Sequence, residues 1–392
     1  MLEKYQLSVL LYNLGRAAGI MGFTCLSFLI ISGDTARFFD KYFGLDKIIK
    51  FQRKFSLFTA TFLILHPLFF ILSDSLFAKY LIFPDFTLPP LALGIISFYI
   101  FITVMAASLA YKRISNTVWQ YIHILTYVLF FFSLYHAVNW GSDSSSIFIK
   151  SLYSVLFICA LCGIVFRTQY KIRKYYSDKF YVKKIKCETG DTFSLILSRP
   201  KNFSFKAGQF CFLRLNKKRL YARHPFTISS APGQQDLRFT IKNTGRFTEA
   251  AINLKLGDEV VVEGPFGIFT PKDSAKNLLL IAGGVGITPF LSIIKNLQLE
   301  NKKIDVILLY GSKTKEDIIC KKELDDIKGD WFKKVYVING HITESLIKKH
   351  VKDITGFSCY ICGPEPMKKT VKKALYNLGA KKRDIIIEDF FW

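Results

Sequence analysis

The chain has 392 residues, of which 51% are hydrophobic and 16% aromatic, and it carries a formal net charge of +24. Its eight cysteines have no disulfide-like or iron–sulfur spacing, and Cys359 and Cys362 stand in an apolar context unlike that of a zinc knuckle. The sequence therefore argues against a disulfide-stabilised, an iron–sulfur or a zinc-binding protein. The basic residues favour an anionic membrane surface and a phosphate-bearing nucleotide; since no nucleic-acid-binding motif is present, we expect no nucleic-acid partner.

The apolar residues are concentrated in about the first 170 positions, where five segments are long enough to cross a membrane. A hydrocarbon core of about 30 Å is spanned by about 20 helical residues. The first segment is too long, and too poor in a small-residue cleavage site, for a removable signal peptide. The predicted spans are 7–31, 55–72, 91–111, 118–140 and 147–166.

The basic residues of the connecting segments predict the orientation, since Lys and Arg accumulate on the cytoplasmic side of a membrane. The connection at 32–54 and the exit at 167–174 contain several lysines and arginines. The connection at 73–90 has only Lys79, and the one at 141–146 has no basic residue. We therefore expect a multi-pass protein of the cell (inner) membrane, with the N-terminus outside and the C-terminal half in the reducing cytoplasm.

Three histidines lie in runs that contain no Lys, Arg, Asp or Glu: His66 in FLILHPLFFIL, and His123 and His136 in VWQYIHILTYVLFFFSLYHAVNW. An imidazole in hydrocarbon is unfavourable, so a functional role is the default reading, and haem iron is a partner that neutral imidazoles bind. For any one of them, a core histidine bonded to a neighbouring carbonyl is the alternative. The three together favour haem.

The sequence pattern changes near residue 170. Short β-rich runs separated by Gly, Pro and Asn turns predict an antiparallel barrel up to about residue 275. From about residue 276, apolar strands alternate with helices, which predicts a parallel sheet with covering helices. The predicted fold is multi-domain: a helical transmembrane bundle (1–170), a β-barrel domain (171–275) and an α/β domain (276–392).

Two glycine-containing segments follow strands of the predicted parallel sheet. AGGVGITPF (282–290) stands between a strand and a helix, where glycines let the backbone approach a pyrophosphate and the helix N-terminus meets its charge. CGPEPM (362–367) follows another strand. Because ligands bind at the carboxyl edge of parallel strands, the two segments together predict a dinucleotide site.

Within the predicted barrel, RHPFTISS (223–230) and GRFT (245–248) complete an ordered set of motifs. With the two glycine segments they resemble the ferredoxin-reductase-like module over nearly all of 175–392. Together with the membrane half, the chain resembles the NADPH oxidase and ferric reductase superfamily of transmembrane flavocytochromes, in particular bacterial NADPH oxidase-like members. The membrane part of this resemblance rests on hydropathy and three histidines, and the family's first transmembrane helix has no counterpart among the five spans.

The resemblance implies FAD and NAD(P)H as cofactors. Thr227, near the reactive edge of the flavin, and Cys362, beside the nicotinamide, are the implied catalytic positions. An ordinary barrel strand with a glycine turn is the alternative for the flavin motifs. The implied FAD residues are Arg223, His224, Pro225, Phe226, Thr227, Gly245, Phe247 and Thr248, and the implied nicotinamide dinucleotide residues are Gly283, Gly284, Gly286, Thr288, Pro289, Gly363, Pro364 and Met367.

The C-terminal EDFFW matches the family's ending, in which an aromatic side chain stacks on the flavin until nicotinamide displaces it. Either Phe390 or Trp392 would take this role, and hydrophobic packing of the tail is the alternative for both. Ser312 and Lys313, just past the strand DVILLY, would meet a ribose 2′-phosphate and so favour NADPH over NADH. A solvated loop lysine is equally consistent with the sequence.

Family members carry two stacked b haems on four histidines, and this chain departs from that pattern. His66 and His136 correspond to the family's outer pair of histidines. Of the inner pair, His123 is present, but its partner histidine is replaced by Gln52, fourteen residues before His66. Fourteen residues advance a helix by about 21 Å and return to within about 40° of the same face, so Gln52 takes the inner position. The inner site then holds a haem on His123 alone, a haem on His123 with Gln52, or no haem; we favour a haem on His123.

These expectations define a transmembrane oxidoreductase. Hydride passes from NAD(P)H to FAD in the cytoplasm, and single electrons pass through haem to an outer acceptor, either dioxygen, giving superoxide, or a ferric complex, giving ferrous iron. The alternatives are a membrane-anchored NAD(P)H:flavin reductase without haem and a non-enzymatic haem-binding sensor subunit. The expected partners are the lipid bilayer, NAD(P)H and the acceptor, and the sequence indicates no particular protein partner.

Overall fold

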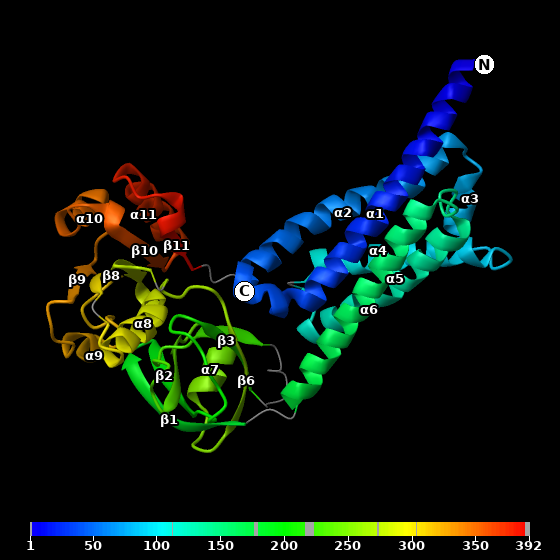
Figure 1. Ribbon diagram of the computed structural model, residues 1–392. Helices are drawn as coiled ribbons and strands as arrows, with labels where there is room; N and C mark the ends of the chain where they lie inside the picture. The colour runs from blue at the N-terminus through cyan, green and yellow to red at the C-terminus, as the bar shows by residue number, and fades with distance from the viewer. Residues whose placement is uncertain are drawn as a thin grey trace. The chain divides into compact units, whose positions relative to one another are not determined.

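The computed structural model describes residues 2–111, 113–175, 179–215, 223–272, 274–302 and 304–388. The chain divides into two compact units (Figure 1). The helical unit comprises Met1–Phe39 and Lys47–Tyr176, and the sheet unit comprises Asp40–Asp46 and Ser177–Trp392.

Long helices make up the helical unit, in which α4 and α5 pack closely together (Figure 1). Among the described residues, five helices are long and apolar enough to cross a membrane, which confirms the five predicted spans. The helices are α1 (Leu2–Phe43), α2 (Leu45–Ser73), the short α3 (Phe77–Ile82), α4 (Pro89–Leu109), α5 (Asn116–Trp140) and α6 (Ile147–Tyr175).

The predicted connection at 32–54 is wrong in its extent, because nearly all of it is helical. α1 continues to Phe43 and α2 begins at Leu45, so only Gly44 separates them, with a φ of 81° that favours glycine. The basic residues of this region therefore lie within α1 and α2, in the parts of these helices that extend beyond their apolar segments. Gln52 consequently lies in the same helix as His66.

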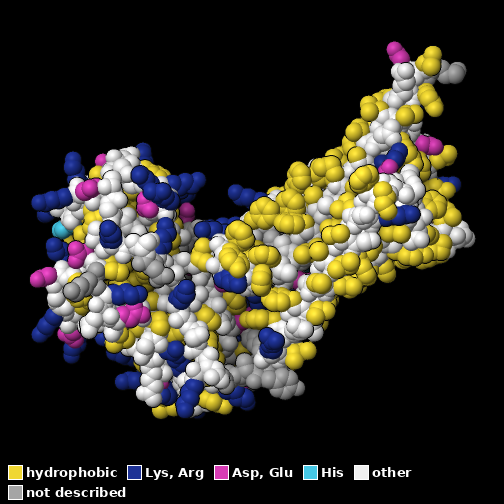
Figure 2. All heavy atoms as spheres, in the orientation of Figure 1, with side chains coloured by type: hydrophobic (Ala, Val, Ile, Leu, Met, Phe, Trp, Pro, Cys, Tyr) yellow, Lys and Arg dark blue, Asp and Glu magenta, His cyan; other side chains and the backbone are white. Residues whose placement is uncertain are grey.

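Aromatic packing joins the helices of this unit, and their outer surface stays apolar. Phe23 of α1 stacks on Phe130 of α5 at 5.5 Å and meets the edge of Tyr153 from α6 at 5.4 Å. Large hydrophobic side chains such as Leu57 and Phe148 are exposed, and Figure 2 shows hydrophobic side chains over the visible face of these helices. An apolar surface of this extent is typical of helices that face lipid.

The first lobe of the sheet unit, the antiparallel lobe, is a six-stranded sheet of order β4-β3-β6-β1-β2-β5. Its buried face is filled by alternate side chains such as Phe193, Leu195 and Leu197 of β2. The helix α7 (Arg246–Ile252) also belongs to this lobe. The strands are β1 (Phe180–Thr189), β2 (Thr192–Ser198), β3 (Phe210–Leu215), β4 (His224–Thr227), β5 (Asp236–Lys242) and β6 (Glu259–Phe266).

The predicted barrel is correct in its antiparallel strands but not in its closure. Within the described residues, the edge strands β4 and β5 are joined by a single bridge, between Ile228 and Phe239, and not by a ladder. β4 has only four residues, and the amide of Ile228 just beyond it donates to the carbonyl of Gln209. The chain therefore leaves the edge before a ladder with β5 can form.

The second lobe, the parallel lobe, confirms the predicted parallel sheet, with strand order β11-β10-β7-β8-β9. Both faces of the sheet are covered: Leu278 and Leu280 pack in one apolar cluster, Leu279 and Ile281 in another. Such two-sided burial explains why these strands are continuously apolar in sequence. The elements are β7 (Asn277–Gly283), α8 (Thr288–Leu299), β8 (Asp305–Ser312), α9 (Lys321–Asp325), β9 (Phe332–Ile338), α10 (Glu344–His350), β10 (Phe357–Cys362), α11 (Glu365–Asn377) and β11 (Ile385–Ile387).

Candidate functional site

In the helical unit, the structure brings two of the three predicted histidine ligands together. His66 of α2 and His136 of α5 have their ring centroids 6.3 Å apart, with the ring planes inclined at 74°. Metal–imidazole bonds are about 2 Å long, so two imidazoles on opposite sides of one iron have their centroids about 6 Å apart. The spacing of the two rings therefore fits a bis-imidazole haem.

Hydrogen bonds at the other ring nitrogen orient both histidines. His66 Nδ1 lies 2.8 Å from the carbonyl oxygen of Gly15, and His136 Nδ1 lies 2.9 Å from that of Pro90. Because a carbonyl only accepts, each Nδ1 carries the proton and donates, which leaves the Nε2 lone pair for a metal. Metal-bound histidines usually have such a second partner.

Two glycines give these rings their space. A Cβ added to Gly19 of α1 would lie 2.6 Å from His66 Nδ1, and one added to Gly94 of α4 would lie 2.5 Å from His136 Nδ1. Both distances are shorter than any real Cβ contact. Any larger residue at either position would displace the histidine.

A mainly apolar cavity of the helical unit contains both rings. Its lining includes Gly19, Phe23, Leu63, Phe101 and Leu129, which suits a flat apolar macrocycle. Arg16 and Asp143 also line it, and the Arg16 guanidinium donates to the Asp143 carboxylate. The cavity thus offers two imidazoles, apolar walls and one ion pair.

The inner position of the same helices is arranged differently. Gln52 Nε2 donates to Ser32 Oγ of α1 at 3.0 Å, and a Cβ on Gly33 would lie 3.9 Å from Gln52 Nε2, an ordinary contact. His123 stacks on Trp119, one turn earlier in α5, with centroids 4.4 Å apart. One imidazole and one amide are therefore the metal-binding groups available at the two predicted positions.

A buried polar cluster that the sequence analysis did not predict lies one turn beyond His123. Asp34 of α1 is 2% exposed and accepts from Tyr127 of α5 at 2.6 Å and from Arg167 of α6 at 2.9 Å. Arg167 also donates to the Tyr127 hydroxyl. The cluster ties three helices together around one carboxylate.

The structure places the predicted flavin residues on β4 and α7 of the antiparallel lobe. Thr227 is 5% exposed, and its Oγ1 is buried with no hydrogen-bond partner in the described part of the chain. His224 and Phe226 both pack on Phe247, with centroids 4.2 and 5.7 Å away. An unpaired buried hydroxyl is unfavourable, so it fits a bound polar group such as a flavin edge.

The other predicted flavin residues surround this strand. Arg223 stands over the ring of Phe212 and reaches Glu263 at 3.5 Å, and Pro225 of β4 is paired with Phe212 of β3. Thr248 Oγ1 contacts Asn243 Oδ1 and accepts from the amide of Gly245, so it is used in shaping the turn before α7. Burial lowers the pKa of His224, so its neutral form is favoured.

The two glycine segments of the parallel lobe lie against one another, as predicted. β7 and β10 pair directly, with Ala282 opposite Cys362. A Cβ on Gly286 would lie 2.3 Å from the Cys362 carbonyl oxygen, and one on Gly283 would lie 2.7 Å from Met367 Sδ and 2.9 Å from Pro364 Cδ. Only glycine permits this close approach of the two segments.

The remaining predicted residues are placed as follows. Gly284 has a φ of 55° and begins the short turn before α8, where Thr288 caps the turn by donating to Val285 and Pro289 stands at the start of the helix. Gly363 has a φ of 157°, and Ser312 ends β8 just before Lys313. Phe390 and Trp392 lie outside the described residues.

Some of these features had signals in the sequence. Gly19 and Gly33 are fourteen residues apart, the same spacing as Gln52 and His66, which points to two equivalent levels in α1 and α2. Arg16 is the one charged residue within the first apolar span, and Asp34 lies just after the end of this span. A charged residue within or beside a membrane span indicates a functional role. Which helices these charges meet is not written in the local sequence.

Three protein families match successive parts of the chain. Residues 18–134 match the ferric reductase like transmembrane component, residues 177–270 an FAD-binding domain, and residues 280–373 an oxidoreductase NAD-binding domain. The match to the first family, with the five apolar helices, makes this a multi-pass membrane protein. The other two make it an oxidoreductase with FAD- and NAD(P)-binding domains.

Curated relatives are similar to about half of this chain. The reductase subunit of glycine betaine monooxygenase from Chromohalobacter salexigens is 31% identical over 50% of this chain, which spans only 59% of that protein. NADH-cytochrome b5 reductase 1 from Dictyostelium discoideum is 31% identical over 45% of this chain and 68% of its own length. The protein of that name from Kluyveromyces lactis is 28% identical over 59% of this chain and 94% of its own.

A solved structure shares the fold of about half of the chain. The Amycolatopsis cytochrome P450 reductase GcoB covers 54% of this chain and 69% of its own length, with a TM-score of 0.50 and 22% identity. The order of the three matched domains is that of the NADPH oxidases and ferric reductases. The chain belongs to this superfamily, and its C-terminal half belongs to the flavoprotein reductases that include NADH-cytochrome b5 reductase.

Proposed function

We propose that this protein transfers electrons from cytoplasmic NAD(P)H, through FAD and haem, to an acceptor on the outer side of the cell membrane. The proposed domains are the transmembrane haem domain (1–170), the FAD domain (171–275) and the NAD(P) domain (276–392). When bound, the flavin converts a hydride into single electrons and the haem iron relays them. The protein's own residues bind, orient and separate these groups.

The observation that carries the proposal is the His66 and His136 pair. Their centroids are 6.3 Å apart, and both Nδ1 atoms are engaged by backbone carbonyls. Both rings line one cavity, and two core histidines that served packing alone would have no reason to line it at this spacing with Nδ1 already bonded. We therefore assign the outer haem to this pair and an inner haem to His123, with Gln52 held by Ser32.

In the sheet unit, the proposed roles follow from burial and close approach. The unpartnered Thr227 hydroxyl would meet the flavin edge, and the aromatic face formed by His224, Phe226 and Phe247 would support the cofactor. The close contact of Gly286 with Cys362 would bring the pyrophosphate and the nicotinamide of the dinucleotide to the same edge of the parallel sheet. Either Phe390 or Trp392 is the proposed aromatic that covers the flavin.

The proposed acceptor is dioxygen or a ferric complex, and the dinucleotide is NADPH or NADH. Relatives named for NADH support NADH, whereas Lys313 after β8 supports NADPH. Turnover with each dinucleotide in wild type and Lys313→Ala separates them, because loss of a phosphate contact weakens only NADPH. Superoxide trapped during turnover identifies dioxygen, and ferrous iron formed without superoxide identifies a ferric complex.

Haem content per chain tests the proposal. We expect two haems in wild type and one in both His66→Ala and His123→Ala, since each variant removes one site. One haem in wild type that His123→Ala leaves intact would refute the inner site. No haem in cofactor-replete protein would leave a membrane-anchored flavin reductase, and failure of NAD(P)H to bleach bound flavin would favour a haem-binding sensor subunit.

A further inference from the structure

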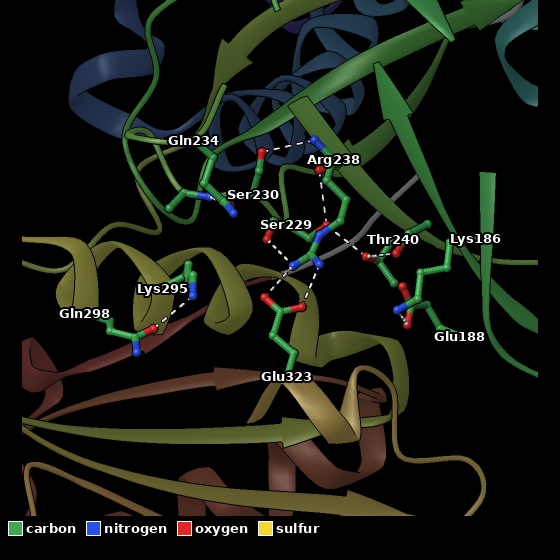
Figure 3. A network of polar contacts seen from close by, with 12 residues as sticks. Lys186, Glu188, Ser229, Ser230, Gln234, Arg238, Thr240, Lys295, Gln298 and Glu323 are labelled. Carbon is green, nitrogen blue, oxygen red and sulfur yellow. Dashed lines mark hydrogen bonds and ion pairs between the residues drawn. The ribbon is translucent and has the colours of Figure 1, made fainter. Parts of the chain in front are cut away.

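One half-buried arginine connects the two lobes of the sheet unit. Arg238 lies on β5 of the antiparallel lobe, and Glu323 lies on α9 of the parallel lobe (Figure 3). Arg238 Nη1 lies 2.7 Å from Glu323 Oε2, and Nη2 lies 3.2 Å from Oε1. This two-point geometry fixes direction as well as distance, unlike a contact made by a lysine.

The pair is largely removed from solvent. The side chains of Arg238 and Glu323 are 15% and 28% exposed. Burial by itself lowers the pKa of Arg238, but the hydrogen bonds and charge of Glu323 outweigh it and raise the pKa. The Arg238 guanidinium therefore stays charged, in surroundings that screen the pair less than a surface pair.

The same arginine also holds the strand that carries the proposed flavin residues. Arg238 Nη2 donates to the carbonyl of Ser229, and the Arg238 amide donates to Ser230 Oγ. Ser229 Oγ in turn contacts Thr240 Oγ1 at 2.8 Å. Ser229 and Ser230 stand two and three residues after Thr227, the last residue of β4, so the guanidinium links the end of this strand to α9.

A second contact between the lobes ends on the same segment. Ser292 Oγ of α8 donates to the carbonyl of Ser230 at 2.6 Å. Ser292 is 0% exposed and lies one turn after Thr288, at the start of the proposed dinucleotide helix. The end of the flavin strand is thus joined to two elements of the parallel lobe.

We propose that Arg238 and Glu323 are a positioning pair, which holds the dinucleotide lobe at the distance from the flavin strand that hydride transfer requires. The inference rests on the proposed function of the sheet unit and adds residues that touch neither cofactor. A shift of about 1 Å between the hydride donor and the flavin can slow a reaction about 100-fold. Binding of the dinucleotide to its lobe, and of the flavin to the other, depends less on that distance. Loss of the pair therefore lowers the rate of flavin reduction and leaves dinucleotide affinity nearly unchanged.

The test measures single-turnover flavin reduction by NAD(P)H in the full chain, for wild type, Glu323→Gln and Arg238→Lys. We expect both variants to reduce flavin about tenfold more slowly at saturating dinucleotide, with its dissociation constant within twofold of wild type. The primary isotope effect with deuterated NAD(P)H should rise, because hydride transfer becomes more limiting. Arg238→Lys keeps the charge and tests the loss of the two-point contact alone.

A matched control lies on the same strand. Asp236 pairs with Lys183 at 2.6 Å within the antiparallel lobe, with side chains 36% and 45% exposed. Asp236→Asn removes an ion pair of β5 that does not connect the lobes, so its flavin reduction should equal that of wild type. In the full chain as purified, Glu323→Gln should also speed amide exchange of residues 228–240 and of α9, and Asp236→Asn should not.

Each outcome has a defined meaning. Flavin reduction in both variants at the wild-type rate overturns the positioning pair. A loss of dinucleotide affinity equal to the loss of rate, with an unchanged isotope effect, also overturns it and leaves a binding or folding role. If wild-type flavin is not reduced by NAD(P)H at all, the proposed function fails, while the exchange measurement still decides whether the two lobes are clamped.

Discussion

The helical unit carries two levels of potential ligands on the same helices, and they are built differently. At the outer level, His66 and His136 contact glycine positions so closely that no Cβ fits, and both rings are bonded to backbone carbonyls. At the inner level, Gln52 is bonded to a side chain, Ser32, and Gly33 is in ordinary contact with it. The outer level is thus preorganised for two imidazoles, and the inner level for one.

The charges near the two levels differ in the same way. Arg16 and Asp143 of the outer cavity have side chains 33% and 30% exposed. Near the inner level, the Asp34 side chain is 1% exposed and is held by Arg167 and Tyr127. The inner level is therefore stabilised by a buried polar cluster, whereas the outer one is shaped by close backbone approach. Each property can be changed separately.

The largest effect is expected from filling the space beside an outer histidine. In Gly94→Ala the new Cβ would lie 2.5 Å from His136 Nδ1, so the ring must leave its bond to Pro90 and the outer haem should be lost. Gly33→Ala is the matched control, because its Cβ would lie 3.9 Å from Gln52 Nε2. Haem content per chain measures both, and full haem in Gly94→Ala would contradict the preorganised outer level.

Converting the inner level into a copy of the outer one should change its ligation but not its haem count. In Gln52→His a second imidazole stands opposite His123, so the reduced absorption and electron paramagnetic resonance spectra should gain a second low-spin bis-histidine component. Gln52→Ala also removes the bond to Ser32 but supplies no imidazole, and should show no such component. Spectra of Gln52→His identical to wild type would mean that this position does not face the inner site.

Removal of the buried carboxylate should destabilise the protein more than removal of the exposed one. Asp34→Ala leaves the guanidinium of Arg167 and the hydroxyl of Tyr127 without their buried acceptor. Because the Arg167 side chain is 38% exposed and can reach solvent, the free energy of unfolding should fall by about 2 kcal/mol, the cost of losing a buried acceptor. Asp143→Ala should lower it by less than about 1 kcal/mol, because the Asp143 carboxylate is itself 30% exposed, whereas that of Asp34 is 1% exposed. Unfolding in detergent compares the two, and equal shifts would contradict the difference between the levels.

The sequence predicts the parts of this molecule that depend on local pattern. Five apolar spans, the parallel sheet and the approach of the two glycine segments follow from hydropathy, strand alternation and turn residues. The missing closure of the barrel depends on where β4 ends and which carbonyl Ile228 meets, and neither is visible in a short stretch of sequence. The same holds for the partners of Asp34 and Arg238, which lie 93 and 85 residues away in the chain.

His224, which lies outside the membrane-spanning helices, should have the smallest of the expected effects, a change in how stability depends on pH. Burial lowers the pKa of His224 from its ordinary value of 6.5, so folding favours the neutral ring. Its contribution to stability is therefore fully present above pH 6.5 and is lost as the pH falls through the lowered folded-state pKa. The free energy of unfolding of cofactor-free wild type should fall relative to His224→Gln, by less than about 1 kcal/mol, between pH 7.5 and 5.5. Replacement of the exposed His341 is the control, and a wild-type advantage that grows on acidification would show that the His224 ring is charged in the folded protein.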